Sequence, residues 1–163
     1  MGATMKLSSF FRRNRESGRP QPLKEVEEKS CGIIVYLNRQ GVREYLLLHY
    51  PGGHWDFPKG HVEPDDADDL ATAQRELTEE TGITELAMDP TYETAMYYEF
   101  NRGRKEKVKK TVVYFLARTN SNRIELSHEH KGFQWLPYEQ ALKRLTFENA
   151  RQLLRRAESH LQA

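Results

Sequence analysis

The sequence has little cysteine, no long hydrophobic run and almost no net charge. A single cysteine, Cys31, excludes an internal disulfide and any zinc site built from several thiolates. No apolar stretch approaches the ~20 residues that a membrane-spanning helix needs. The formal net charge of +1 argues against a nucleic-acid binder that works through bulk positive charge. With 163 residues, 37% of them hydrophobic, the chain is expected to form one soluble domain with a substantial core.

Residues 1–28 differ in composition from the rest of the chain. They are polar, rich in arginine and interrupted by proline. Such a segment buries too little apolar surface to become ordered. We therefore expect residues 1–28 to form a disordered basic arm, with a weak organelle-targeting segment as the alternative. Residues 29–163 are expected to form the domain.

Hydrophobic periodicity and turn residues predict the secondary structure. The apolar run CGIIVYL (31–37) is typical of a buried strand, so its thiol is expected to be buried as well. Further strands are predicted over 43–50, 85–88, 92–100, 110–118 and 132–136. Helices are predicted over 68–81, from Pro137, and in a C-terminal segment where Phe147, Ala150, Leu154, Ala157 and Leu161 share one face. Mixed strands with helices before and after them predict an α/β fold, an α/β/α sandwich around a mixed β-sheet.

The predicted helix over 68–81 carries three carboxylates close together. Glu76, Glu79 and Glu80 are three and four residues apart, so they share one helical face. A separate apolar stripe that includes Leu77 anchors this helix to a core. Such side chains repel one another unless a cation binds them, and hard oxygen ligands suit Mg²⁺ or Mn²⁺ with phosphate as a co-ligand. The alternative for an acidic run is a solvated face.

The segment 60–83 resembles the Nudix box, G-x₅-E-x₇-R-E-U-x-E-E-x-G-U, where U is a bulky aliphatic residue. Every position from Arg75 onward fits this pattern. The spacing departs in one place, because Gly60 lies fifteen residues before Arg75 where the pattern has fourteen. We interpret this as one extra residue near Ala67, with Asp66 replacing the first Glu as the partner of Arg75. The resemblance implies the Nudix fold.

Three further stretches are similar to one Nudix branch, the asymmetrical bis(5′-nucleosyl)-tetraphosphatases. They are HWDFPKGHVEP (54–64), TVVYFLA (111–117) and LSHEHKGFQWL (126–136). The resemblance implies a Mg²⁺-dependent hydrolase, Mn²⁺ being possible, that cleaves diadenosine tetraphosphate into ATP and AMP. One alternative is a Nudix enzyme that acts on capped RNA, diphosphoinositol polyphosphates or nucleoside triphosphates. The other is a nucleotide-binding module without catalysis.

The resemblance also implies roles for individual residues. The metal ligands would be Glu76, Glu79, Glu80, Glu129 and a backbone carbonyl near Lys59. Glu79 or Glu80 would take the proton of the attacking water. Arg75 would position the carboxylates through charge-assisted hydrogen bonds.

Substrate binding needs cations for the polyphosphate and flat surfaces for the bases. Lys59, Lys110 and the basic turn 101–109 are candidates for the cations. By resemblance, Tyr50 and His54 flank the phosphate path, and Tyr97 and Phe147 stack on either side of an adenine. The alternatives are core packing for the two aromatic residues and a solvated hairpin tip for the turn.

The residues His128-Glu129-His130 could also indicate zinc, but no third ligand has a suitable spacing. The expected partner is therefore a small dinucleoside polyphosphate. We expect a cytoplasmic monomer that binds no membrane, and that binds nucleic acid only in the capped-RNA alternative.

Overall fold

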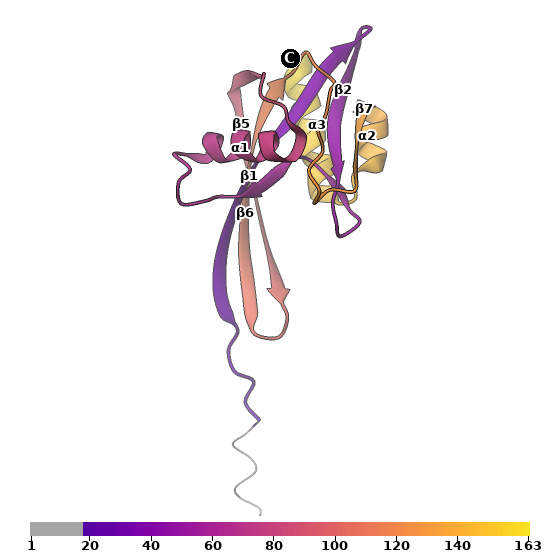
Figure 1. Cartoon of the computed structure of the whole chain (residues 1–163). Helices are drawn as coiled ribbons and strands as arrows, with labels where there is room; N and C mark the ends of the chain where they lie inside the picture. Colours follow the sequence, from indigo (N-terminus) through magenta and orange to yellow (C-terminus); the bar gives the residue numbers. More distant parts are fainter. Residues whose placement is uncertain (1–17) are drawn as a thin grey trace, which may run out of the picture.

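The computed structural model describes residues 18–163, in which a seven-stranded sheet is combined with three helices (Figure 1). The strands are β1 (Lys24–Arg39), β2 (Val42–His49), β3 (Trp55–Asp56), β4 (Lys59–His61), β5 (Ala87–Arg102), β6 (Glu106–Arg118) and β7 (Gly132–Pro137). The helices are α1 (Asp69–Thr81), α2 (Tyr138–Arg144) and α3 (Glu148–Gln162). None of the helices in this described part is long and apolar enough to cross a membrane.

The sheet is mixed, as the sequence predicts. The strand order is β3-β2-β1-β6-β5, with β4 paired to β1 and β7 paired to β2. Strands β1 and β6 run parallel, and the other pairs are antiparallel. Parallel strands in the middle of the sheet require cover on both faces, and that cover comes from the helices.

Two hydrophobic clusters fill the two sides of the sheet. On one side, Ile33 packs in a cluster with Leu77 of α1. On the other side, Ile34 packs in a cluster with Leu154 of α3. Successive side chains of a strand point to opposite faces, so the continuous apolar run of β1 supplies both clusters. The α/β/α sandwich and the buried thiol of Cys31 are thereby confirmed.

Helix α1 occupies almost the same residues as the helix predicted over 68–81. The side chain of Asp68 accepts a hydrogen bond from the N–H of Ala71 at 2.7 Å, which caps the first turn. Gly82 adopts a left-handed conformation (φ 75°), and its N–H donates to the carbonyl of Thr78. These two caps fix the register of the helix, and with it the direction of its carboxylates.

Parts of three strands project from the body as an extension, which we define as residues 24–29 of β1, 97–102 of β5 and 106–111 of β6 (Figure 1). The predicted boundary of the arm at residue 28 is wrong in this respect, because 24–28 pair with 106–110 of β6. Residues 1–17 of the predicted arm lie outside the described part. The two strands predicted over 85–88 and 92–100 form the single strand β5, whose register shifts between Met88 and Glu93.

Candidate active site

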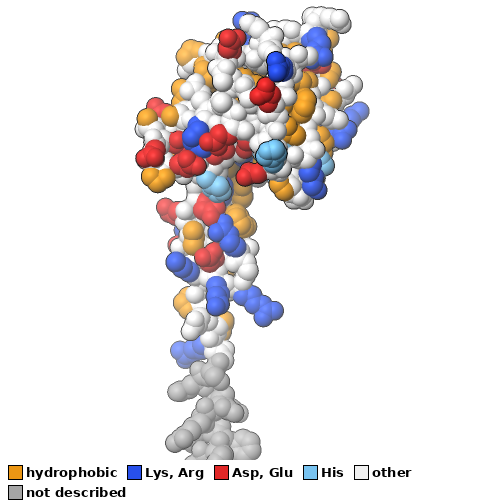
Figure 2. Space-filling view, in the orientation of Figure 1, with side chains coloured by type: hydrophobic (Ala, Val, Ile, Leu, Met, Phe, Trp, Pro, Cys, Tyr) orange, Lys and Arg blue, Asp and Glu red, His pale blue; other side chains and the backbone are white. Residues whose placement is uncertain are grey.

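A cavity of about 600 Å³ lies where α1, the loop after β2, the loop before β7 and the extension meet. Seven of the site residues predicted from sequence line it: Tyr50, His54, Lys59, Glu76, Glu80, Lys110 and Glu129. Figure 2 shows acidic side chains gathered over α1 beside histidines, and mixed charges along the extension. One cavity therefore contains carboxylates, cations and aromatic rings.

Glu80 is the most unusual carboxylate in this cavity. Its residue surface is only 7% exposed, and its Oε2 atom has no hydrogen-bond partner among the described residues. Burial, reinforced by the charge of Glu76, raises the pKa of Glu80 to about 9. A buried carboxylate oxygen without a partner is costly. The protein therefore leaves one of the two carboxylate oxygens of Glu80, Oε2, unsatisfied.

Glu76 lies against the backbone of the loop that precedes α1. A Cβ atom at Gly60 would come within 2.0 Å of the carboxyl carbon of Glu76, so a larger residue at position 60 would displace this carboxylate. Burial raises the pKa of Glu76, whereas the hydrogen bond from Arg75 lowers it. Gly60, the first glycine of the box, thus leaves space for the carboxylate of Glu76.

Arg75 and Asp66 form the pair that the sequence predicts. The Nε and Nη2 atoms of Arg75 donate to the two carboxylate oxygens of Asp66 at 2.8 and 3.0 Å. Asp66 also accepts from the hydroxyl of Thr72 and the N–H of Glu63, at 2.8 and 2.9 Å. The hydrogen bonds from Arg75 hold the pKa of Asp66 well below its usual range. Asp66 thus makes the contact with Arg75 that the interpretation of the box spacing predicts.

Glu79 does not join Glu76 and Glu80 in the cavity. Its side chain is exposed, and both carboxylate oxygens accept from Nη1 of Arg75 at 3.2 Å. The expectation that the three helical carboxylates converge is therefore wrong for Glu79. Within 18–163, no three acidic, histidine or cysteine side chains stand close enough together to bind a metal ion.

The residues nevertheless fit a divalent cation in two respects. The donors at the cavity are carboxylate oxygens, which are the ligands that Mg²⁺ and Mn²⁺ prefer. In addition, the unpartnered Oε2 atom of Glu80 is a buried acceptor beside the carboxylate of Glu76. A cation would satisfy Glu80, which the protein itself does not.

The loop before β7 places His130 and Glu129 at the same cavity. His130 is buried, and its Nδ1 atom lies 3.0 Å from the hydroxyl of Ser127. Burial lowers the pKa of His130, so it is neutral at pH 7, and its Nε2 atom lies 3.9 Å from Oε1 of Glu80. Glu129 and His128 are exposed, and only Glu129 lines the cavity. This arrangement gives no support to the zinc alternative.

Lys59 and Lys110, two of the predicted cations, are each paired with an acid. Nζ of Lys59 donates to Asp56 at 2.6 Å. Lys110 is buried, with Nζ 3.6 Å from Glu28 and 3.4 Å from Nδ1 of His61. Burial lowers the pKa of Lys110. Sequence reasoning missed Glu28 and His61 because their positions on β1 and β4 show no special spacing.

The predicted pairing of Tyr97 with Phe147 is wrong. Tyr97 is 75% exposed and lines a hollow on the other face of the extension, beside Lys29 and Lys109. Phe147 lines a separate cavity of about 430 Å³ together with Tyr98, His54 and Lys59. Tyr98 pairs across the sheet with Lys110 and shares its face. The alternation of Met96, Tyr98 and Phe100 is the signal that would have placed Tyr98, and not Tyr97, on the face of the sheet that carries Phe147.

Tyr50 and His54 lie against each other at the edge of the cavity, so they are neighbours on one side of it. Their rings are stacked, with centroids 4.8 Å apart and an interplanar angle of 12°. The hydroxyl of Tyr50 donates to the carbonyl of Phe57 at 2.6 Å, which fixes the ring. His54 also approaches Phe147, with ring centroids 5.5 Å apart. His54 therefore connects the cavity of the carboxylates to the cavity of Phe147.

Comparison with known proteins identifies related sequences and folds. The family model described as the NUDIX domain matches residues 10–157. The chain is 36% identical over 138 residues to the "Bis(5′-nucleosyl)-tetraphosphatase [asymmetrical]" of Caenorhabditis elegans, and 35% identical over 143 residues to that of Mus musculus. These matches cover 82% of this chain and 96% and 95% of the two relatives.

Solved structures show the same fold. The crystal structure of a C. elegans Ap4A hydrolase binary complex matches with a TM-score of 0.73 and 34% identity, over 82% of this chain and 97% of that chain. The NUDIX domain of Shewanella oneidensis NrtR complexed with ADP ribose matches with a TM-score of 0.67, over 83% of this chain and 89% of that chain. Its identity is 15%, so this likeness concerns the fold alone.

Proposed function

This chain belongs to the Nudix hydrolase family, and from that premise we propose that it hydrolyses dinucleoside tetraphosphates asymmetrically, converting diadenosine tetraphosphate into ATP and AMP. The observation that carries the chemistry is the buried carboxyl group of Glu80, whose Oε2 atom has no partner among the described residues, beside Glu76 and Glu129 in one cavity. The substrate class rests on relatives about 35% identical over most of their length.

We assign Mg²⁺ as the cofactor, with Mn²⁺ as a substitute. Glu76 and Glu80 would bind it together with the backbone carbonyl of Lys59. Glu129 lines the same cavity and is a further candidate ligand, although the three carboxylates do not form a ready-made site in the described part. Glu79, which both its position and the family pattern make a candidate, is engaged by Arg75 instead. When bound, the ion would polarise the attacked phosphate and lower the pKa of a water molecule.

The protein's own groups supply orientation and proton transfer. Glu80 is protonated at neutral pH as long as its burial is uncompensated, because its pKa is about 9. In its carboxylate form, Glu80 would accept the proton of the attacking water. Arg75 contacts Asp66, Glu76 and Glu79 and is a positioning residue. It fixes the helical carboxylates relative to the loop.

Substrate contacts follow from the two adjoining cavities. One adenosine would lie in the 430 Å³ cavity, with its base between Tyr98 and Phe147. Stacking between a base and an aromatic ring is worth about 1–3 kcal/mol. Lys59 and Lys110 would bind the phosphates, and Tyr50 and His54 would flank them. This assignment replaces Tyr97 with its neighbour.

We further propose that the enzyme is a cytoplasmic monomer that binds no membrane. The one cysteine is free and buried, which agrees with a reducing compartment. The exposed large hydrophobic side chains of the described part are scattered over several elements. Gel filtration and cell fractionation test these two assignments.

Product analysis with a panel of phosphoanhydrides tests the activity. The purified protein with Mg²⁺ is incubated with diadenosine tetraphosphate, a capped dinucleotide, a diphosphoinositol polyphosphate and ATP. ATP plus AMP as the products of the first substrate, with the highest kcat/KM of the panel, is the expected result. Two molecules of ADP, or a clear preference for another substrate, would contradict the proposal.

A further inference from the structure

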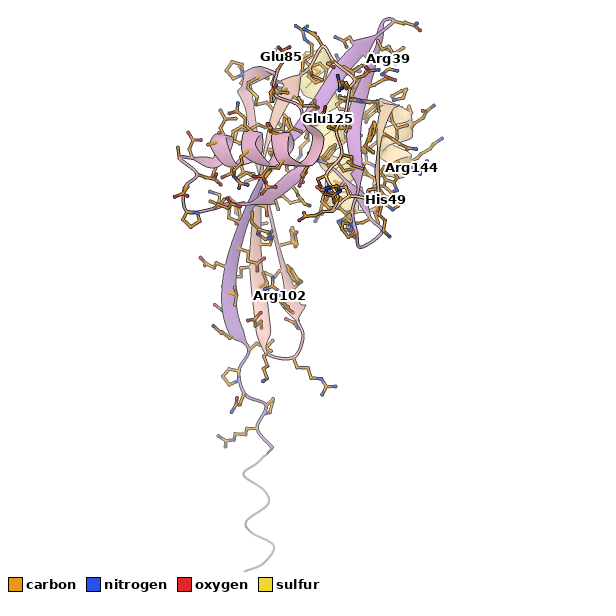
Figure 3. The ribbon with its side chains drawn as sticks, viewed as in Figure 1. Arg39, His49, Glu85, Arg102, Glu125 and Arg144 are labelled. Atoms are coloured by element: carbon orange, nitrogen blue, oxygen red, sulfur yellow. The ribbon has the colours of Figure 1, made fainter. Side chains whose placement is uncertain are left out.

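The inner face of the extension continues the catalytic cavity outward as a row of flat side chains. Tyr98, Phe100 and Arg102 are alternate residues of β5 and therefore share one face. The rings of Tyr98 and Phe100 are stacked, with centroids 6.1 Å apart and an interplanar angle of 29°. The guanidinium of Arg102 lies 5.9 Å from the centroid of Phe100. Figure 3 shows Arg102 on the extension, away from the body of the molecule.

This row is held in position and is partly open to solvent. The guanidinium of Arg102 donates to Glu28 on β1 and lies 3.6 Å from Glu106 on β6. Phe100 remains 39% exposed although it lines the catalytic cavity. Its exposed ring, beside Tyr98 and the guanidinium of Arg102, offers flat surface at the edge of the cavity. Aromatic rings and guanidinium planes are both surfaces on which nucleobases stack.

The two cavities provide places for two ends of a linear substrate. Tyr98, His54 and Lys59 line both of them, so the cavities adjoin at these residues. The Phe147 side holds one flat group, and Phe100 with Arg102 lies at the other end of the larger cavity. Lys110 lies between these ends, paired across the sheet with Tyr98. A ligand with a base at each end and phosphates in the middle matches this order.

We propose that Phe100 and Arg102 form a second base-binding subsite, which takes the distal nucleoside of a dinucleoside polyphosphate while the first base lies between Tyr98 and Phe147. The proposal rests on the proposed function. Stacking uses the face of a base and not its edge, so this subsite accepts adenine and guanine alike. The extension thereby determines a preference for two-ended over one-ended polyphosphates.

Steady-state kinetics on two substrates tests the subsite. Diadenosine tetraphosphate carries both bases, whereas adenosine 5′-tetraphosphate carries one. Phe100→Ala should raise KM for the dinucleotide about tenfold or more with kcat nearly unchanged, the pattern of lost uniform binding. KM for adenosine 5′-tetraphosphate should change by less than about twofold. Phe100→Tyr should restore the KM for the dinucleotide, because it keeps the ring.

Tyr97→Ala is the matched control, since it removes a neighbouring aromatic ring from the opposite face of the same strand and should leave both KM values unchanged. Equal losses on both substrates, accompanied by a lower melting temperature, would make Phe100 a packing residue and overturn the subsite. If the unaltered enzyme hydrolyses both substrates and Phe100→Ala changes neither KM, the subsite alone is refuted. If the unaltered protein cleaves neither substrate, the proposed function fails as well.

Discussion

At the scale of single residues, Glu80 connects the energetics of the fold to the chemistry of the site. Its carboxyl group is buried beside Glu76, and its Oε2 atom has no partner among residues 18–163. The protein accepts this cost at one position of α1, while Glu79, one residue earlier, is satisfied by Arg75 in solvent. The two neighbouring glutamates therefore differ in what they do, although the sequence pattern treats them alike.

Glu80→Gln should reduce kcat at least a hundredfold, on the order of the loss when a catalytic base or charge-stabilising group is removed. Glutamine has nearly the same shape, so the fold should be retained. Glu79→Gln is the matched comparison and should have a clearly smaller effect, because its side chain points away from the cavity. Steady-state turnover with circular dichroism as a fold control measures both. A larger loss for Glu79→Gln would reverse the assignment.

The raised pKa of Glu80 also predicts how stability depends on pH. Its pKa rises from an ordinary 4.5 to about 9, so the folded state binds more protons than the unfolded state between these values. Stability should then fall as pH rises through this window. Without divalent cations at pH 8.5, Glu80→Gln should melt about 3 °C or more above the unaltered protein, since 1 kcal/mol shifts Tm by about 2–4 °C in a domain of this size.

Two comparisons control for this interpretation. At pH 4 the difference in Tm between Glu80→Gln and the unaltered protein should nearly disappear, because residue 80 is then mostly uncharged in both the folded and the unfolded protein. Added Mg²⁺ should raise the Tm of the unaltered protein more than that of the variant, through binding to the folded state. If the melting curves of Glu80→Gln and the unaltered protein coincide at pH 8.5 and respond equally to Mg²⁺, the charge of Glu80 does not destabilise the fold.

At the scale of elements, the loop before α1 and the helix act as one unit joined by Arg75. This side chain contacts Asp66, Glu76, Glu79 and the carbonyl of His61. The close approach of Glu76 to Gly60 joins the same two segments. Asp66 therefore connects the loop to the helix through Arg75, although it is a shorter acid than the Glu of the Nudix box.

Asp66→Ala should reduce turnover about 10–100-fold, as is typical when a group that orients metal ligands is removed. Arg75 would lose its bidentate partner, and the loop would lose the acceptor for Thr72. Asp65→Ala, which removes an exposed neighbouring carboxylate, is the control and should have little effect. A Mg²⁺ titration of activity is the measurement. Equal activation curves for Asp66→Ala and the unaltered enzyme would show that the pair is dispensable.

At the scale of the whole molecule, the described part consists of a sandwich and an extension that share strands. Strands β1, β5 and β6 run through both, so the extension is continuous with the core sheet (Figure 1). Ion pairs lie on its outer face, where Lys107 contacts Glu99 and Lys109 contacts Glu25. The segment that composition assigns to an arm thus contributes a sheet strand from Lys24 onward.

Two N-terminal truncations should behave differently. Removal of residues 1–23 is expected, from composition, to leave melting temperature and turnover nearly unchanged. Removal of residues 1–28 deletes five positions of β1 and the Glu28 partner of Arg102 and Lys110. This longer truncation should lower Tm and raise KM for the dinucleotide. Melting curves and steady-state kinetics of the two truncated proteins are the measurements. Equal Tm and KM values would show that the first five residues of β1 are dispensable.

The sequence predicts those features that depend on local chemistry. The apolar run at 31–37 and the caps at Asp68 and Gly82 each leave a local pattern that the structure confirms. The sequence does not show which residues of β5 face the cavity. Tyr97 and Tyr98 are adjacent and identical, and only the pairing of β5 with β6 distinguishes them. The sequence also does not predict that the polar first residues of β1 form a strand, because the segment of β6 with which they pair lies far away in the sequence.

The parallel pairing of β1 with β6 has a consequence for synthesis on the ribosome. Lys24 pairs with Glu106 and Tyr36 with Arg118, so β1 leaves the ribosome long before its central partner exists. At 5–20 residues per second this interval lasts roughly 4–16 s. During that time the apolar run 31–37 can pair only with β2 and β4, and the edge that later pairs with β6 is open. Nascent chains of this protein should therefore expose an aggregation-prone strand edge and bind chaperones until residue 118 has left the ribosome.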